Sequence, residues 1–345
     1  SGDRSRADAL LPAEPCAGGM LRGVTAGWDE RALVDEIGAQ HVHFWISWRS
    51  VQPTLSPPYL ALSEVDEAAV ASLAGDNKRF AGPDAALQRY QGKTLVLGLG
   101  SGFTNAMPDI AGSAGGERVT PDRIGRDAYI AQLLLYARAT VRRYRGKVAG
   151  WQIENEPNVA AETIAFGWRA GDAWTDRAFV RRVLEVLRDA VRSEDPQAFI
   201  TINFHTDIHY EQDIVDWRDL VDRVGIDAYP NYVLGKPLQT ARVAERVRRA
   251  RALADGRPVI IMETGYPSAP TASGYSEANQ ARYIDEVFAQ ARDAGACALY
   301  WFKLTSPEDA GSAEPPLENY WGVVRADATK KAGWARLRAA LAAGP

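Results

Sequence analysis

Eight short apolar segments alternate along this chain with longer segments whose apolar residues recur at helical spacing. Two of the short segments, Thr94–Leu97 and Val259–Met262, are almost continuously apolar, which is typical of strands buried on both faces of a parallel sheet. The strands expected from the pattern are Met20–Thr25, His41–Ser47, Thr94–Gly98, Val148–Glu154, Phe199–Phe204, Val224–Ala228, Val259–Glu263 and Ala296–Phe302. The helices expected between and after them are Glu30–Ala39, Pro83–Tyr90, Arg123–Tyr144, Asp176–Ser193, Ile214–Val221, Thr240–Leu253, Glu277–Ala294 and Lys330–Ala342.

This alternation predicts an α/β fold, a closed parallel (β/α)8 or TIM barrel. An open, doubly wound sheet is the alternative, but residues 21–27 lack the Gly-x-Gly-x-x-Gly loop that usually follows its first strand. No repeat or linker divides the chain, so we expect a flexible leader over residues 1–18 and one barrel over residues 19–345. Long insertions follow four of the strands, on the side where barrel enzymes carry their active sites. These insertions are Gln52–Gly82, Ser101–Asp122, Asn158–Ala173 and Ser306–Trp321.

Composition and charge indicate which kinds of partner and environment the chain is suited to. The net charge of -4 and the lack of a Lys/Arg block give no reason to expect a nucleic-acid partner. No run of about 18 apolar residues exists, so we expect no membrane span. The two cysteines, Cys16 and Cys297, can pair, but so small a count does not demand a disulfide. The chain begins without Met, which fits a processed end and leaves a removed export signal open.

Two glutamates stand at predicted strand ends. Glu263 closes the apolar run that begins at Val259, and a single charge there must be paired or functional, because burying it alone is costly. Glu156 follows the fourth strand in Asn155-Glu156-Pro157, where the proline ends the ladder and fixes the turn. On a parallel barrel both carboxyl groups would lie at the same mouth. Carboxyl groups about 5 Å apart act as nucleophile and acid/base on a glycosidic bond, with retention of configuration.

At these residues the sequence resembles the clan A glycoside hydrolases, which are (β/α)8 enzymes. In that clan the acid/base follows Asn on strand four and the nucleophile is a Glu that ends strand seven. The resemblance therefore implies that Glu156 is the acid/base, that Glu263 is the nucleophile, and that Asn155 donates to a substrate hydroxyl.

The resemblance extends to three other strands. The segment Trp45–Pro53 is similar to the Trp-x-x-x-x-Pro segment of strand two in the clan. Trp301 stands where clan members place a Trp beneath the sugar, and Tyr229 matches the strand-six Tyr that hydrogen-bonds the nucleophile. The chain departs from the clan at His43, where an Arg usually supports the nucleophile. Either His43 takes that role or Arg49 reaches in from the strand end.

Other polar residues near strand ends have both a binding and a structural interpretation. Glu154 shares a strand face with the acid and could hold it or pair with His43. His205 is placed to touch a sugar hydroxyl or to cap a loop, and Asp227 is placed to bind sugar, orient Tyr229 or form a structural pair. Aromatic rings can stack on apolar sugar faces. After Trp301, the candidate rings in decreasing order are Trp45, Trp168, Trp174, Tyr232, Tyr266 and Trp321.

Two other classes remain open. A metal-dependent barrel hydrolase could use His41, His43 and His205, although it would need every one of the 4 histidines. A non-catalytic carbohydrate-binding barrel could keep the aromatic rings alone. We expect a carbohydrate substrate with a β-linkage, no cofactor and no bound metal, a monomer, and export to a secreted or periplasmic location. The strand-seven segment around Glu263 resembles endo-1,3-β-glucanases, whereas the strand-four segment is closer to β-galactosidases and xylosidase-like members, so the sugar stays unassigned.

Overall fold

The computed structural model describes residues 16, 18–100, 106–114, 116–159, 169, 171–307 and 316–344. Its eight barrel strands are parallel and close in the order β1-β10-β9-β8-β7-β6-β4-β2. This confirms the predicted (β/α)8 barrel. The strands are β1 (Leu21–Thr25), β2 (His41–Ser47), β4 (Thr94–Gly100), β6 (Gly150–Asn155), β7 (Phe199–His205), β8 (Arg223–Ala228), β9 (Val259–Thr264) and β10 (Ala298–Trp301).

The chain forms two compact units, which are described separately. The first comprises residues 1–44, 203–218 and 222–345, and the second comprises residues 45–202 and 219–221. The leader expected over residues 1–18 lies outside the described residues except for Cys16 and Gly18.

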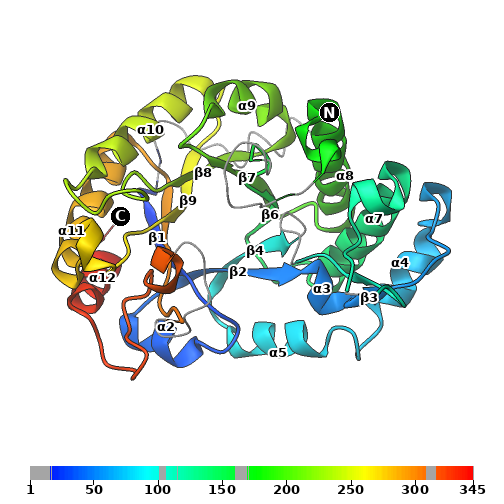
Figure 1. Cartoon of the computed structure of the whole chain (residues 1–345), viewed down its shortest axis with the longest axis horizontal. Coiled ribbons are helices and arrows are strands. Elements are labelled where there is room, and N and C mark those ends of the chain that lie inside the picture. Colours follow the sequence, from blue (N-terminus) through cyan, green and yellow to red (C-terminus); the bar gives the residue numbers. More distant parts are fainter. Residues whose placement is uncertain are drawn as a thin grey trace. The chain divides into compact units, whose positions relative to one another are not determined.

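In the first unit, β8, β9, β10 and β1 are hydrogen-bonded neighbours, and α10 packs against β8, β9 and α11 (Figure 1). Residues Val259–Met262 of β9 are almost completely buried, as expected for a strand covered on both faces. The helices of this unit are α2 (Arg31–Ile37), α9 (Tyr210–Trp217), α10 (Thr240–Leu253), α11 (Glu277–Ala294) and α12 (Ala332–Ala342). Its short 3₁₀ helices are η5 (Thr271–Ser273) and η6 (Pro316–Asn319).

In the second unit, β4 and β6 pair, and α7 packs on both α4 and α8 (Figure 1). Local sequence sets the helix starts: the Asp66 and Asp176 side chains accept hydrogen bonds from the first-turn amides of α4 and α8. The helices are α3 (Trp48–Val51), α4 (Glu67–Ala74), α5 (Ala81–Arg89), α6 (Pro121–Ile124), α7 (Arg126–Arg143) and α8 (Arg177–Glu194). The 3₁₀ helices η1 (Leu62–Glu64), η3 (Asp172–Thr175) and η4 (Arg218–Leu220) and the short strands β3 (Thr54–Leu55) and β5 (Asp109–Ile110) complete the element list.

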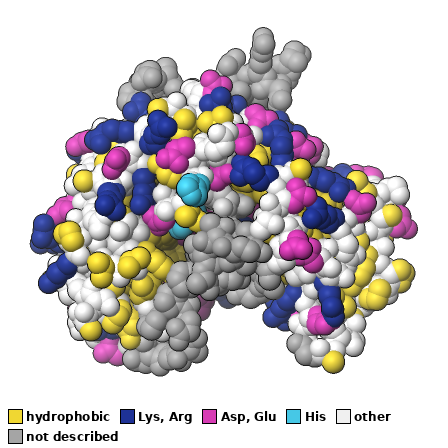
Figure 2. Space-filling model, turned by 45° about the horizontal axis from the view of Figure 1, so that its top comes forward, with side chains coloured by type: hydrophobic (Ala, Val, Ile, Leu, Met, Phe, Trp, Pro, Cys, Tyr) yellow, Lys and Arg dark blue, Asp and Glu magenta, His cyan; other side chains and the backbone are white. Residues whose placement is uncertain are grey.

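The surface gives no sign of a single-charge face in the view of Figure 2, where basic and acidic side chains are interspersed. Within the described ranges, no helix is both long enough and apolar enough to cross a membrane. Cys16 and Cys297 form a disulfide with their Cα atoms 5.6 Å apart, which answers the question that the cysteine count left open.

Candidate active site

Glu263 lies one residue before the end of β9, and its side chain is almost completely buried. The Tyr229 hydroxyl, just beyond β8, donates a hydrogen bond of 2.6 Å to Glu263 Oε2. This is the contact that the clan resemblance implies for the strand-six tyrosine. A hydrogen bond to a charged acceptor is among the stronger polar interactions in proteins, so Tyr229 both orients the carboxylate and stabilises its charge.

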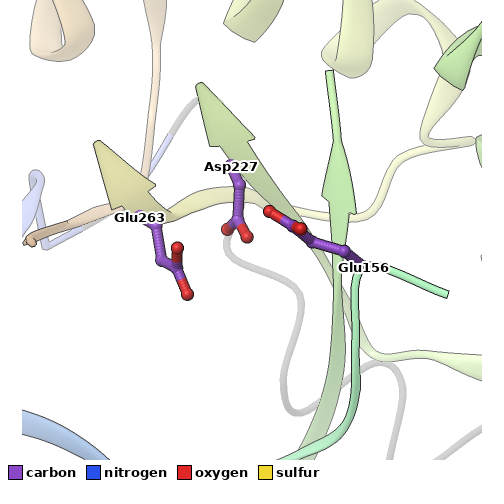
Figure 3. Close-up of side chains that lie close together, drawn as sticks. All are labelled: Glu156, Asp227 and Glu263. Carbon is purple, nitrogen blue, oxygen red and sulfur yellow. The ribbon is translucent and has the colours of Figure 1, made fainter. Parts of the chain in front are cut away.

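Asp227 lies opposite Glu263 in the register of β8 and β9. Figure 3 shows the two carboxyl side chains leaving the ends of these neighbouring strands. The Asn203 side-chain amide donates a 2.7 Å hydrogen bond to Asp227 Oδ2, and the Asp227 side chain is fully buried. The structure thus gives Asp227 a partner on β7, which is the structural pairing foreseen as one of its possible roles.

His205, the last residue of β7, lies 3.8 Å from Asp207 in the loop that follows. Asp207 also forms an ion pair with Arg246 on α10, with 2.5 Å between Asp207 Oδ1 and the Arg246 guanidinium. The imidazole of His205 is mostly buried. It therefore lies in a cluster of charged side chains at the carboxyl end of its strand, and its contact with a substrate hydroxyl stays a prediction.

His43, which replaces the usual arginine of the clan, is fully buried in β2. Its Nδ1 lies 3.4 Å from the Thr25 hydroxyl, and its ring meets Tyr300 edge-on with centroids 6.1 Å apart. These contacts fix the ring inside the barrel wall.

Trp301 and Tyr266, two rings expected to stack on sugar, are less exposed than stacking requires. Trp301 and Tyr266 are fully buried, with Tyr283 packed against both rings. The Tyr266 hydroxyl donates to the Gly235 carbonyl, so this residue ties two loops together. The expected sugar stacking on Trp301 and Tyr266 stays a prediction, because neither ring has an exposed face in the structure.

Glu156 follows β6 directly (Figure 3), and its side chain is almost completely buried. Its backbone has φ of 45°, a left-handed conformation that is uncommon for residues other than glycine. Such conformations cluster at functional sites and persist only where the surroundings hold them. Here Arg169 and Val159 N hold the backbone in place by donating hydrogen bonds to the Glu156 carbonyl, at 2.7 Å and 3.0 Å.

Arg169 was not foreseen from the sequence. It is buried, lies 3.4 Å from Glu154 Oε1, and donates to the carbonyls of Asn155, Glu156 and Val159. Glu154 also accepts a hydrogen bond from Asn155 N, at 2.9 Å. Arg169 therefore clamps the turn that carries the candidate acid, and it gives Glu154 a charged partner. No signal identified it, because it stands in an insertion without periodicity.

Two expected binding residues of the second unit, Arg49 and Trp174, make contacts with other side chains of that unit. Arg49 pairs with Asp109 at 2.7 Å and donates to the Met107 carbonyl, and its support of the nucleophile stays a prediction. Trp174 is buried in an aromatic cluster with Tyr129 and Phe179. This packing accounts for the position of Trp174 without a role in sugar binding.

Trp45 is half-buried on β2, and the neighbouring strand makes room for its ring. A Cβ atom at Gly98 would lie 2.2 Å from the Trp45 ring, so only glycine fits there. Trp45 stays a candidate ring for substrate contact. Trp168 lies outside the described residues.

Glu30, in the loop after β1, is a partly buried carboxyl that the sequence pattern indicates only as the start of a helix. Its Oε1 accepts a 2.7 Å hydrogen bond from Gly27 N. Burial raises the pKa of this carboxyl, and the Gly27 amide, the Thr305 hydroxyl and the charge of Lys303 oppose that shift only in part.

Within the described residues, the histidines do not gather with other His, Cys, Asp or Glu side chains into a metal-binding group. The metal-dependent hydrolase stays an alternative to the glycoside hydrolase.

The fold resembles that of the clan A TIM-barrel glycoside hydrolases. A family model described as β-galactosidase, of glycoside hydrolase family 42, matches residues 175–336. No curated protein matches the chain by sequence.

Solved structures of families 5 and 10 have the same fold. A family 5 enzyme from Streptomyces cattleya, in complex with Manβ1-4GlcNAc, has a TM-score of 0.66 at 16% identity, over 93% of this chain and 80% of that one. An exo-β-1,4-mannosidase from Opitutaceae bacterium strain TAV5 has a TM-score of 0.63 at 16% identity, over 96% of this chain and 61% of that one. A xylanase from Cellvibrio japonicus has a TM-score of 0.62 at 13% identity, over 98% of this chain and 100% of that one. All these matches are to clan A glycoside hydrolases, which confirms the resemblance expected from the sequence.

Proposed function

We propose that the protein is a retaining glycoside hydrolase of β-linked sugars, with Glu263 as nucleophile and Glu156 as acid/base. The observation that carries the proposal is the Glu263 carboxylate at the end of a buried barrel strand, fixed by the Tyr229 hydroxyl at 2.6 Å. The position of Glu156 at the carboxyl end of β6, in a turn clamped by Arg169, supports its pairing with Glu263 in one mechanism.

The proposed reaction has two displacements. Glu263 attacks the anomeric carbon and forms a glycosyl ester, while Glu156 gives its proton to the departing glycosidic oxygen. Glu156 then takes a proton from water, and the resulting hydroxide attacks the anomeric carbon and releases Glu263. The product keeps the β-configuration, and the sum of the two steps consumes one water.

The first test replaces each glutamate with its amide. Glu156→Gln and Glu263→Gln should each lower kcat at least about a hundredfold, because each removes a group that acts on the reacting atoms. Glu185→Gln serves as the matched control, since Glu185 is a partly exposed partner of Arg181 on α8, and its activity should stay within about twofold. If both active-site variants kept wild-type turnover with an intact fold, the catalytic assignment would be wrong.

The substrate panel and the stereochemistry complete the test. The matched proteins act on different sugars, so the panel includes β-galactosides, β-mannosides, β-xylosides and β-glucosides. NMR of the first product anomer should show retention, and inversion would reject Glu263 as nucleophile. Activity that is lost in EDTA and restored by a metal would favour the metal-dependent alternative, whereas binding without turnover across the panel would favour a non-catalytic carbohydrate-binding barrel.

A further inference from the structure

The loop that follows β8 has an exposed apolar tip close in sequence to Tyr229. Val233 is 80% exposed and Leu234 is 57% exposed. A single exposed apolar side chain is ordinary in a folded protein. Two adjacent ones, a few residues beyond the hydrogen-bond partner of Glu263, need a closer explanation.

The loop is held so that this tip stays exposed. Asn231 is buried, and its side-chain amide donates to the carbonyls of Leu234 (2.8 Å) and Pro237 (2.9 Å), while its Oδ1 accepts from Gln239 N (2.9 Å). On the other side of the tip, Gly235 N donates to the Ser273 carbonyl at 2.9 Å. The contacts on both sides of Val233 and Leu234 therefore fix the conformation in which the two side chains face solvent.

Gly235 also packs closely against its neighbour loop. A Cβ atom there would lie 2.3 Å from Tyr275 N and 2.4 Å from the Gly274 carbonyl carbon, so the close approach requires glycine. A rigid loop that presents apolar atoms to water is preorganised for a ligand with an apolar face, because no ordering cost remains on binding.

Aromatic rings connect the tip to the candidate nucleophile. Tyr232, next to the tip, stacks on Trp321 with centroids 6.2 Å apart and an interplanar angle of 25°. Trp321 in turn lies 5.0 Å from the ring of Tyr229, whose hydroxyl is bonded to Glu263. The carboxylate of Glu318 braces this row, accepting from Trp321 Nε1 at 2.7 Å and from the Tyr232 hydroxyl at 3.0 Å.

We propose that Tyr232, Val233 and Leu234 form a subsite for a second sugar residue of the substrate, next to the sugar at the cleaved bond. Sugar rings present an apolar C–H face that packs on aromatic and aliphatic side chains. The aromatic row makes the tip continuous with the residues around Glu263, and the occupant is therefore another part of the same glycan. The substrate class is thus an oligosaccharide or polysaccharide rather than a simple glycoside. This inference rests on the proposed function.

The kinetic test compares a long substrate with one that cannot reach the subsite. The long probes are β-1,4-linked tetrasaccharides of galactose, glucose, mannose and xylose, and the short probes are the β-glycosyl fluorides of the same sugars. In the double variant Val233→Ser/Leu234→Ser, kcat/KM for the tetrasaccharide should fall about tenfold or more, and kcat/KM for the fluoride should change less than about twofold. Tyr232→Ala should show the same split. An equal loss on both substrates, or no loss on either, would overturn the subsite.

A matched control comes from the other unit. Leu62 is 46% exposed at the start of η1, so Leu62→Ser removes an apolar side chain of similar exposure and should change neither substrate. Tyr232→Phe keeps the ring and loses only the bond to Glu318, and it should retain most of the tetrasaccharide activity.

Calorimetry separates failure of the subsite from failure of the proposed function. The binding of the four tetrasaccharides is measured to the wild-type chain and to Val233→Ser/Leu234→Ser. If the wild type hydrolyses no probe but binds a tetrasaccharide at least tenfold more tightly than the double variant, the subsite stands and the hydrolase proposal falls. Equal binding by both proteins, or no binding by the wild type, would refute the subsite.

Discussion

The hydrogen bond from Tyr229 to Glu263 orients the carboxylate that we propose as the nucleophile. We expect Tyr229→Phe to lower kcat/KM by about 10- to 100-fold, because a hydrogen bond to a charged group contributes about 1.5–3 kcal/mol. The shape of the ring is kept, so its packing at 5.0 Å from Trp321 should survive. Steady-state kinetics on the best panel substrate measures the effect. Tyr59→Phe, in a partly exposed loop, is the control, and wild-type kinetics for both variants would remove Tyr229 from the mechanism.

Single residues were predictable where a strand fixes them. The Gly-Ile-Asp-Ala-Tyr-Pro segment ends β8, so strand geometry carries Tyr229 to the vicinity of Glu263. Arg169 and Arg49 depend instead on the path of long insertions, which periodicity does not determine. Ring exposure was also beyond the sequence: Trp301 and Tyr266 stand near strand ends as expected, yet tertiary packing covers both.

At the scale of elements, the pattern located every barrel strand to within a few residues, because buried strands leave long apolar runs. The helix α4 was missed, although Asp66 caps it, because the whole segment was assigned to an insertion. The packing of α8 on α7 also forms a charge cluster that no local pattern indicates. Glu194, the last residue of α8, is buried and accepts hydrogen bonds from Arg138 and Arg142 on α7 and from Arg145 just beyond it.

This cluster predicts a pH-dependent contribution to stability. Burial raises the pKa of Glu194, but the hydrogen bonds and charges of Arg142 and Arg138 outweigh burial, and the net pKa lies below its ordinary 4.5. A carboxyl whose pKa is lower in the folded state stabilises that state above its unfolded pKa, and this stability is lost as the pH falls through the folded pKa. The sign is therefore stabilising at neutral pH.

We expect Glu194→Gln to lower the free energy of unfolding by about 3 kcal/mol at pH 7, since it leaves three guanidinium groups without their shared carboxylate. The gap from wild type should narrow as the pH falls below 4.5. Urea unfolding at pH 7 and pH 4 measures both values. Glu185→Gln on the same helix should cost less than about 0.5 kcal/mol at either pH. A gap for Glu194→Gln that stays constant with pH would contradict the role of its charge.

At the scale of the whole molecule, barrel closure followed from the count of alternating segments, because a parallel sheet of eight such units has a well-known closed form. The covalent link between Cys16 and Cys297 did not follow, because two cysteines 281 residues apart carry no pairing signal of their own. The disulfide joins Cys16 to the residue before β10, where Cys297 N donates a 2.8 Å hydrogen bond to the Val259 carbonyl.

A crosslink over so long a separation restricts the unfolded chain strongly, and removing a native disulfide typically costs about 2–5 kcal/mol. We expect the double variant Cys16→Ser/Cys297→Ser to unfold at a lower temperature and a lower urea concentration than the oxidised wild type. Dithiothreitol should bring the wild type to the values of the double variant and leave the variant itself unchanged. Activity at 25 °C should be the same in both proteins, because Cys297 lies beside Val259 at the start of β9, whereas Glu263 lies near the opposite end of that strand. Two reactive thiols in unfolded, unreduced wild-type protein would show that the cysteines are not paired, and the stability difference should then vanish.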